Sequence, residues 1–216
     1  MLALGLALAV GSLGAAEAAA RSGALIPPPA QPAVVQLIDA PAQAQADTPV
    51  AAEPAWQGRD LDGDGAPDFA NPTGGPPRSH DAYGDGFFHA SRDGGARPHE
   101  GVDYDDQPGQ TVVAPISGYV SKIGYAYPGD SKLRYVEIEN PALRLTARAL
   151  YVDPSVQVGE SVQVGHPIGA ALSLQRRYPG ITNHVHLEIA EDGQRIDAQT
   201  MILARGPDGG VMTGMN

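Results

Sequence analysis

Two histidine-containing motifs carry the residue types that bind metal ions in proteins. The first motif, HEGVD at residues 99–103, places an imidazole and a carboxylate four residues apart. The second, His184-Val185-His186, lies in an alternating apolar run that predicts a strand with both imidazoles on one face. Two such strands lying side by side would bring three or four metal-binding side chains together. A His, Asp, His set around zinc leaves a fourth coordination position open, as catalytic zinc sites do.

The segments around these motifs are predicted to form a β-sheet fold. Gly 27 and Pro 20 among 216 residues indicate many turns and exclude a helix bundle. The pattern of residues 158–169, with glycines between apolar pairs, predicts tight antiparallel hairpins, and only residues 197–204 predict a helix. We therefore expect an all-β antiparallel sandwich or open barrel with a short C-terminal helix. Its strands are expected from short β-branched or aromatic runs at residues 111–114, 118–124, 133–139 and 145–152.

The net charge and the absence of cysteine exclude several kinds of binding partner and functional site. The formal net charge of −11 at pH 7 makes binding to nucleic acid or to an anionic membrane unfavourable. The chain has no cysteine, which excludes disulfide frameworks, thiolate zinc sites and cysteine nucleophiles. Any metal must therefore be held by histidines and carboxylates. No apolar stretch reaches the roughly 20 residues of a transmembrane span.

Composition divides the chain into five predicted segments. Residues 1–20 are apolar and end in small residues, which is typical of a signal peptide, with an apolar core helix as the alternative. Export combined with the absence of cysteine predicts a secreted or periplasmic protein of a bacterial envelope. The other segments are a Pro/Ala-rich tether (21–56), an acidic Gly-rich segment (57–96), a domain that contains both histidine motifs (97–204) and a flexible tail (205–216).

A second metal-binding pattern lies in the acidic segment. Its carboxylates occupy positions 1, 3, 5 and 9 of a loop with glycine at position 6, as in the first part of an EF-hand calcium loop: Asp60, Asp62, Asp64 and Asp68. Position 12 is Asn71, where a bidentate glutamate belongs, so a complete EF-hand is excluded. Two interpretations stay open, a calcium loop without flanking helices and a plain acidic turn.

The two histidine motifs and their flanking stretches resemble the lysostaphin-type zinc endopeptidases, metallopeptidase family 23. The signature of that family is H-x-x-x-D followed by H-x-H. The resemblance covers residues 97–197 and includes VAPISG at 113–118 and VGESVQVG at 158–165. It implies the fold of that family, cleavage of peptide bonds in peptidoglycan cross-links, His184 beside the attacking water, and three zinc ligands: His99, Asp103 and His186.

The chain departs from the family pattern at one catalytic position. The family supplies a further histidine from a Tyr-x-His-Leu stretch, and here the corresponding residues 148–154 read RALYVDP. Tyr151 is the nearest substitute. Its phenol can donate a hydrogen bond to an oxyanion, but with an ordinary pKa near 10 it is a poor general base. The sequences of residues 150–152 and 178–186 also resemble a secreted animal branch of this fold. That branch keeps the metal and is regarded as lacking peptidase activity.

Two functions are therefore consistent with these residues. The first is an exported zinc metallopeptidase with His184 and Tyr151 as catalytic residues. The second is a catalytically degenerate zinc-binding module that recognises wall peptides or activates another hydrolase. A calcium-stiffened surface protein is a third class, supported by the acidic loop alone. Glu100 and Glu188 are expected on the opposite strand face from the ligands, in solvent.

Overall fold

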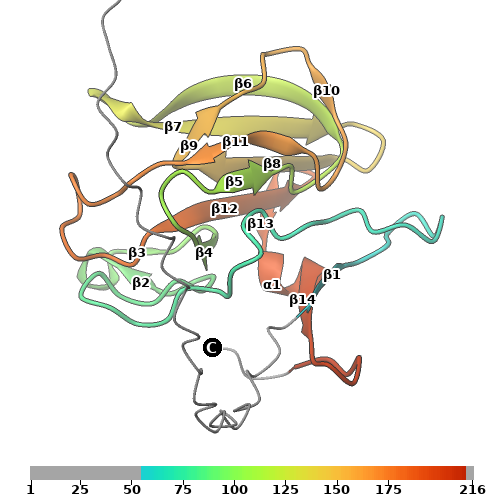
Figure 1. Cartoon of the computed structure of the whole chain (residues 1–216), viewed down its shortest axis with the longest axis horizontal. Helices are drawn as coiled ribbons and strands as arrows, with labels where there is room; N and C mark the ends of the chain where they lie inside the picture. Colours follow the sequence, from blue (N-terminus) through green and yellow to red (C-terminus); the bar gives the residue numbers. More distant parts are fainter. Residues whose placement is uncertain (1–54, 213–216) are drawn as a thin grey trace, which may run out of the picture. The chain divides into compact units, whose positions relative to one another are not determined.

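The structure is a computed structural model that describes residues 55–212 (Figure 1). The predicted signal peptide (1–20) and all but the last two residues of the predicted tether (21–56) lie outside the described residues. In chain order the elements are β1 (Ala55–Gly58), β2 (Ser91–Arg92), β3 (Arg97–Pro98), β4 (Val102–Asp105), β5 (Thr111–Val113), β6 (Gly118–Tyr127), β7 (Asp130–Asn140), β8 (Leu145–Leu150), β9 (Val152–Pro154), β10 (Ser161–Val162), β11 (Pro167–Ala171), β12 (His184–Glu191), β13 (Gln194–Ile196), α1 (Ala198–Met201) and β14 (Ile202–Arg205).

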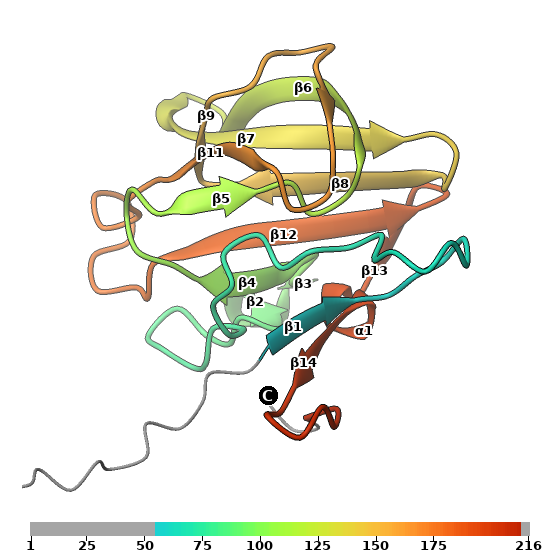
Figure 2. The same cartoon turned by 45° about the vertical axis from the view of Figure 1, so that its right-hand side comes forward.

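Two antiparallel sheets enclose the core. The larger has seven strands in the order β10-β6-β7-β8-β12-β13, with β4 also paired to β12, and the smaller has the order β5-β11-β9. The small sheet lies against the large one, and β6 curls at the top of the molecule (Figures 1 and 2). Val112 and Ile168 of the small sheet share one buried cluster with Ile138 and Leu187 of the large sheet. The predicted all-β antiparallel architecture is confirmed.

The strand β12 is paired along both edges. His184–Leu187 pair with β4 and Ile189–Glu191 with β13, while β8 lies along the other edge from His186 onward. Every residue from His184 to Ala190 is buried. Because side chains alternate along a strand, His184, His186 and Glu188 share one face. The sheet therefore holds the H-x-H motif in a fixed register.

The predicted short C-terminal helix is confirmed, but it is shorter than predicted. Within residues 197–204 only Ala198–Met201 is helical, capped by the Asp197 side chain, which accepts a hydrogen bond from the backbone of Gln199 at 2.9 Å. Residues Ile202–Arg205 instead form β14 and pair with β1, because pairing with a distant strand outweighs the weak helix propensity of so short a segment.

The prediction of hairpins at residues 158–169 is wrong. The two strands of this segment, β10 and β11, belong to different sheets: β10 pairs with β6, and β11 pairs with β5 and β9. Gly165, with φ of 80°, turns the chain between them, a conformation that favours glycine. The glycine pattern marked the turns correctly, but it carried no information on the pairing partners.

Residues ahead of position 97 contribute to the core. Phe69 is 1% exposed and forms an isolated bridge with Ile116. The ring of Trp56 lies edge-on to Tyr104, with centroids 6.0 Å apart. Phe69 of the acidic Gly-rich segment and Trp56, the last residue of the predicted tether, thus both pack on the hydrophobic core.

No helix within residues 55–212 has the length and apolar character needed to cross a membrane.

Asp106, after β4, is a buried carboxylate with an unusual pKa. Its side chain accepts a hydrogen bond from Asn183, while its second oxygen has no partner among the described residues. Burial raises the pKa of Asp106 to about 6, against the effect of the Asn183 hydrogen bond. The folded state therefore favours the protonated carboxyl. Because the folded pKa exceeds the ordinary 3.8, this contribution is present below about pH 4 and is lost as pH rises through 6.

Asp106→Asn is expected to change the pH dependence of stability. The variant cannot ionise, so its free energy of unfolding relative to the parent should rise by about 1–2 kcal/mol between pH 4.5 and pH 7.5. Denaturant unfolding of the metal-free proteins across this range measures the difference. The exposed Asp153→Asn serves as the control and should show no such trend. A parent-to-variant difference that is flat with pH would contradict the assigned pKa.

Candidate metal centre

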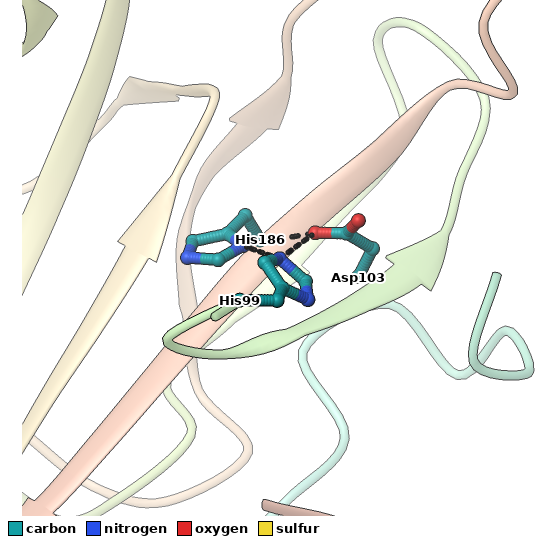
Figure 3. Close-up of side chains that lie close together, drawn as sticks. All are labelled: His99, Asp103 and His186. Carbon is teal, nitrogen blue, oxygen red and sulfur yellow. Dashed lines mark hydrogen bonds and ion pairs between the residues drawn. The ribbon is translucent and has the colours of Figure 1, made fainter. Parts of the chain in front are cut away.

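Strand pairing brings together the residues of the two histidine motifs. His186 of β12 lies directly opposite Asp103 of β4 in the ladder. His99 follows β3, and its backbone N–H donates to the carbonyl of Ala90 at 2.8 Å. The three side chains point toward one another (Figure 3), with His186 Nδ1 2.8 Å from His99 Nε2 and 2.9 Å from Asp103 Oδ1. All three are buried.

The outer ring nitrogens of these imidazoles face hydrogen-bond acceptors. His99 Nδ1 lies 2.9 Å from the carbonyl oxygen of Phe87, and His186 Nε2 lies 3.4 Å from Glu188 Oε1. Because both partners accept hydrogen bonds, we assign the proton to the outer nitrogen in each ring. Once the inner nitrogens are deprotonated, as metal binding requires, their lone pairs and Asp103 Oδ1 face the same point. Two nitrogens and one oxygen at these distances need a cation between them, either a proton or a metal ion, and their composition fits zinc.

His184 lies beside this group without belonging to it. Its Nδ1 is 2.7 Å from the carbonyl oxygen of Thr182, which leaves Nε2 unprotonated and 3.5 Å from Asp103 Oδ1. The three residues whose ligand atoms lie close enough to hold a metal ion together are His99, Asp103 and His186. Burial lowers the pKa of His184 despite the nearby Asp103 carboxylate. A neutral imidazole with a free nitrogen can accept a proton from a neighbouring water.

The charged groups of the centre stabilise one another. Burial by itself would raise the pKa of Asp103, but the attraction of His184 and hydrogen bonds from His186 and His99 lower it well below the ordinary value. Burial likewise opposes protonation of His186, yet its hydrogen bonds to Asp103 and Glu188 raise its pKa to about 9. Burial lowers the pKa of His99. With a pKa of about 9, the His186 imidazole is protonated at neutral pH in the metal-free centre and pairs with the Asp103 carboxylate. Zinc would replace the proton on its inner nitrogen, Nδ1.

The expectation that Glu188 lies in solvent is wrong. Its side chain is buried and shares a strand face with His186, two residues before it. Glu188 Oε2 lies 2.6 Å from Arg195 and 3.1 Å from Arg148, while Oε1 faces the His186 ring. The two-residue period of the strand was the signal that could have identified it. Glu100 is exposed, as expected.

Tyr151 lies next to the histidines, directly after β8. Its ring centroid is 5.5 Å from that of His184, and its hydroxyl is 2.5 Å from the hydroxyl of Tyr127. Burial, followed by the contact with Tyr127, raises the pKa of Tyr151 well above 10. The phenol is therefore protonated and can only donate or share its proton at neutral pH. Tyr127 belongs to no recognisable motif, so the sequence pattern does not identify it as a site residue.

The histidines, Asp103 and Tyr151 line one cavity of about 560 Å³. Aromatic residues form part of its wall, with Tyr83, Tyr127 and Tyr178 beside Tyr151. Three arginines that the sequence analysis also missed line the cavity: Arg78, Arg92 and Arg97. A substrate chain approaching the histidines would meet both groups.

The acidic loop of the second pattern is exposed. Ligand atoms of Asp60, Asp62 and Asp64 lie within 4.8 Å of one another. These carboxylates also accept hydrogen bonds from the loop backbone: Asp60 from Gly63 at 2.6 Å, and Asp64 from Ala66 at 2.7 Å. Asp68 is apart from this group and accepts from the backbone of Leu61 at 2.7 Å. Both the calcium loop and the acidic turn stay predictions.

Calcium binding to this loop would stabilise the folded state by mass action. Millimolar calcium is then expected to raise the melting temperature, and Asp62→Ala combined with Asp64→Ala is expected to abolish the increase. Magnesium at equal concentration is the control for ionic strength. An unchanged melting temperature in the parent would leave the loop as an acidic turn whose carboxylates satisfy its own backbone.

Comparison with known proteins places this site in a family. The profile of Peptidase family M23 matches residues 97–198. Mouse Leukocyte cell-derived chemotaxin-2 is 35% identical over 116 residues, which are 51% of this chain and 71% of the mouse protein. The chain belongs to peptidase family M23. The M23 match contains all five residues of the metal centre and its surroundings: His99, Asp103, Tyr151, His184 and His186.

Other relatives of this M23 chain share shorter parts of their length. Myeloid protein 1 of Gallus gallus is 33% identical over 120 residues, 55% of this chain and 36% of the chicken protein. Among solved structures, lysostaphin from Staphylococcus simulans is 20% identical with a TM-score of 0.43, over 57% of this chain and 52% of lysostaphin. The residues of β1 and β2, Arg78 and the acidic loop precede the M23 match.

Proposed function

We propose that this chain is an exported zinc metallopeptidase that hydrolyses peptide bonds in peptidoglycan cross-links. The observation that carries the proposal is the convergence of His99 Nε2, Asp103 Oδ1 and His186 Nδ1 inside a cavity. Family membership supports peptide bonds as the substrate. Zinc held by these three atoms would supply Lewis-acid chemistry for hydrolysis.

The other residues of the cavity have roles that follow from their hydrogen bonds. His184 Nε2 would accept a proton from the attacking water and return it to the leaving amine, because Thr182 fixes the opposite nitrogen as the N–H. Tyr151 would donate its phenol hydrogen to the developing oxyanion. Tyr127 holds that hydroxyl at 2.5 Å. The Glu188 carboxylate orients the His186 ring.

Export to a bacterial envelope or secretion is part of the same proposal. It is supported by the apolar residues 1–20, the tether-like composition of residues 21–56 and the absence of cysteine. The net charge of −11 disfavours a nucleic-acid partner.

A second candidate function is a zinc-binding module without turnover. It is favoured by the absence of the family's further histidine, for which Tyr151 is the nearest substitute, and by the Tyr151 hydroxyl being engaged by Tyr127. The mouse relative is named a chemotaxin, not a peptidase. In this case the cavity would recognise wall peptides or present a surface to another hydrolase.

Digestion of purified cell walls separates these functions. The zinc-loaded chain is expected to release peptide fragments that mass analysis identifies, and the chelated chain is expected to release none. The masses of the fragments name the cleaved bond. A folded, zinc-loaded chain that releases no product from any wall type would support the binding module instead.

Tyr151→Phe tests the role of the phenol. The substitution removes only the hydroxyl, so turnover is expected to fall by about 10-fold or more if that hydroxyl meets the oxyanion. Steady-state hydrolysis of a wall-derived peptide at equal zinc content is the measurement. Tyr119→Phe, at an exposed tyrosine of β6, is the matched control. Unchanged turnover in Tyr151→Phe would assign Tyr151 to packing.

A further inference from the structure

The two oxygens of Asp103 face different partners. Oδ1 lies toward the imidazoles, 2.9 Å from His186 and 3.1 Å from His99. Oδ2 lies toward two guanidinium groups. Arg78 reaches it with Nη2 at 2.9 Å and Nε at 3.3 Å, and Arg92 reaches it with Nη2 at 3.3 Å. One oxygen is thus directed to the metal-binding point, and the other is fully engaged.

Arg78 is fixed by contacts on every side. Its side chain is 2% exposed, and its Nη1 donates to the carbonyl of Gly84 at 2.8 Å and lies 2.7 Å from Asp81. Its backbone N–H donates to the Asp103 carbonyl at 2.6 Å. Gly86 packs so closely that a Cβ there would lie 2.6 Å from Arg78 Cβ. The guanidinium is therefore oriented by the fold and needs no ion to place it.

We propose that Arg78, assisted by Arg92, is a positioning residue that holds Asp103 as a one-oxygen metal ligand through Oδ1. The inference rests on the proposed zinc site. Both arginines precede residue 97, where the family match begins, so the segment ahead of the matched domain completes its metal centre. With Oδ2 held, the carboxylate cannot rotate to offer both oxygens. Outer partners of metal ligands typically support metal affinity by 10- to 100-fold.

The guanidinium charge alone would act in the opposite direction. A cation near the site repels a second cation, so charge by itself predicts that removing Arg78 tightens zinc binding. Asp81 at 2.7 Å compensates much of that charge. Positioning predicts weaker binding instead. The sign of the change in zinc affinity therefore separates the two effects.

The test measures zinc affinity of the full chain by competition with a chromophoric chelator at pH 7.5, together with the visible spectrum of the cobalt(II) form. Arg78→Gln is expected to raise the zinc Kd by about 10-fold or more and to change the cobalt bands. Arg78→Lys keeps the charge but cannot donate from two nitrogens to Asp103 Oδ2, so this variant should also bind zinc more weakly than the parent. Arg92→Gln, which loses one contact, should show a smaller change in the same direction.

Arg97→Gln is the matched control. Arg97 lines the same cavity and pairs with Asp93 at 2.7 Å, without touching Asp103. The control removes an equal charge and should leave zinc affinity and the cobalt bands unchanged.

The outcomes are distinguishable. Arg78→Gln that binds zinc as tightly as the parent or more tightly, with the parent's cobalt bands, would overturn the inference. A lowered melting temperature of the zinc-free variant with unchanged affinity would assign Arg78 a purely structural role and overturn it as well. If Arg78→Gln does not fold, Arg92→Gln decides by the same criteria. A parent chain that binds neither metal would overturn the proposed zinc site itself.

Discussion

Replacing His186 by alanine is expected to strip zinc from the protein at neutral pH. The parent should carry close to one zinc per chain. His186 Nδ1 contacts both other proposed ligands, at 2.8 Å from His99 and 2.9 Å from Asp103, so its removal opens the centre. The loss in affinity should exceed the 10- to 100-fold that removal of an outer partner costs. Elemental analysis after dialysis and competition with a chelator measure it.

His166→Ala provides the control for this experiment. His166 lies in the turn before β11, where its backbone pairs with Gln163 and Ala114, outside the metal centre. This variant should retain the parent's zinc. Equal zinc content in His186→Ala and the parent would refute the assignment of His186 as a ligand.

Loss of His184 is expected to abolish turnover while zinc stays bound. The imidazole is buried, with Nε2 free and 3.5 Å from Asp103 Oδ1, so it is placed to exchange a proton without being one of the three ligands. A positioned acid–base group contributes about 10²- to 10⁴-fold in rate. His184→Ala should therefore lower kcat by that factor at unchanged zinc content.

The decisive readout for His184 is the pair of measurements, rate and zinc content. A variant with full zinc and the parent's kcat would remove His184 from the mechanism. A variant that loses zinc together with its activity would instead make His184 a fourth ligand.

The parts of the site that local sequence pattern could predict are those that depend on strand alternation. The H-x-H spacing predicted that His184 and His186 share a face, and the structure places them so on β12. The same period would have placed Glu188 there, had it been applied one step further. The positions of glycine and proline also predicted the turns, because glycine permits backbone angles that other residues avoid and proline fixes its own φ angle.

The parts that could not be predicted depend on contacts between distant segments. Arg78 lies 25 residues before Asp103, in a segment with no recognisable motif, and a lone arginine carries no information about its partner. The pairing of β14 with β1 joins segments about 150 residues apart in the chain, Ala55 opposite Arg205. Strand register of this kind is set by packing over the whole core, not by the strand's own residues.

The different anchoring of the three proposed ligands has a consequence for how the ion exchanges with solvent. Asp103 and His186 lie opposite each other in the β4–β12 ladder, and β12 is also paired with β8 along its other edge. The backbone amides of β12 should therefore be among the slowest to exchange with deuterium. His99 follows the short antiparallel ribbon of β2 and β3, two residues in each strand, which is separate from the large sheet. Local unfolding of that ribbon frees one ligand and leaves the sheet intact. If zinc binds as proposed, a chelator is therefore expected to remove it at a rate set by local opening of this ribbon and independent of global stability.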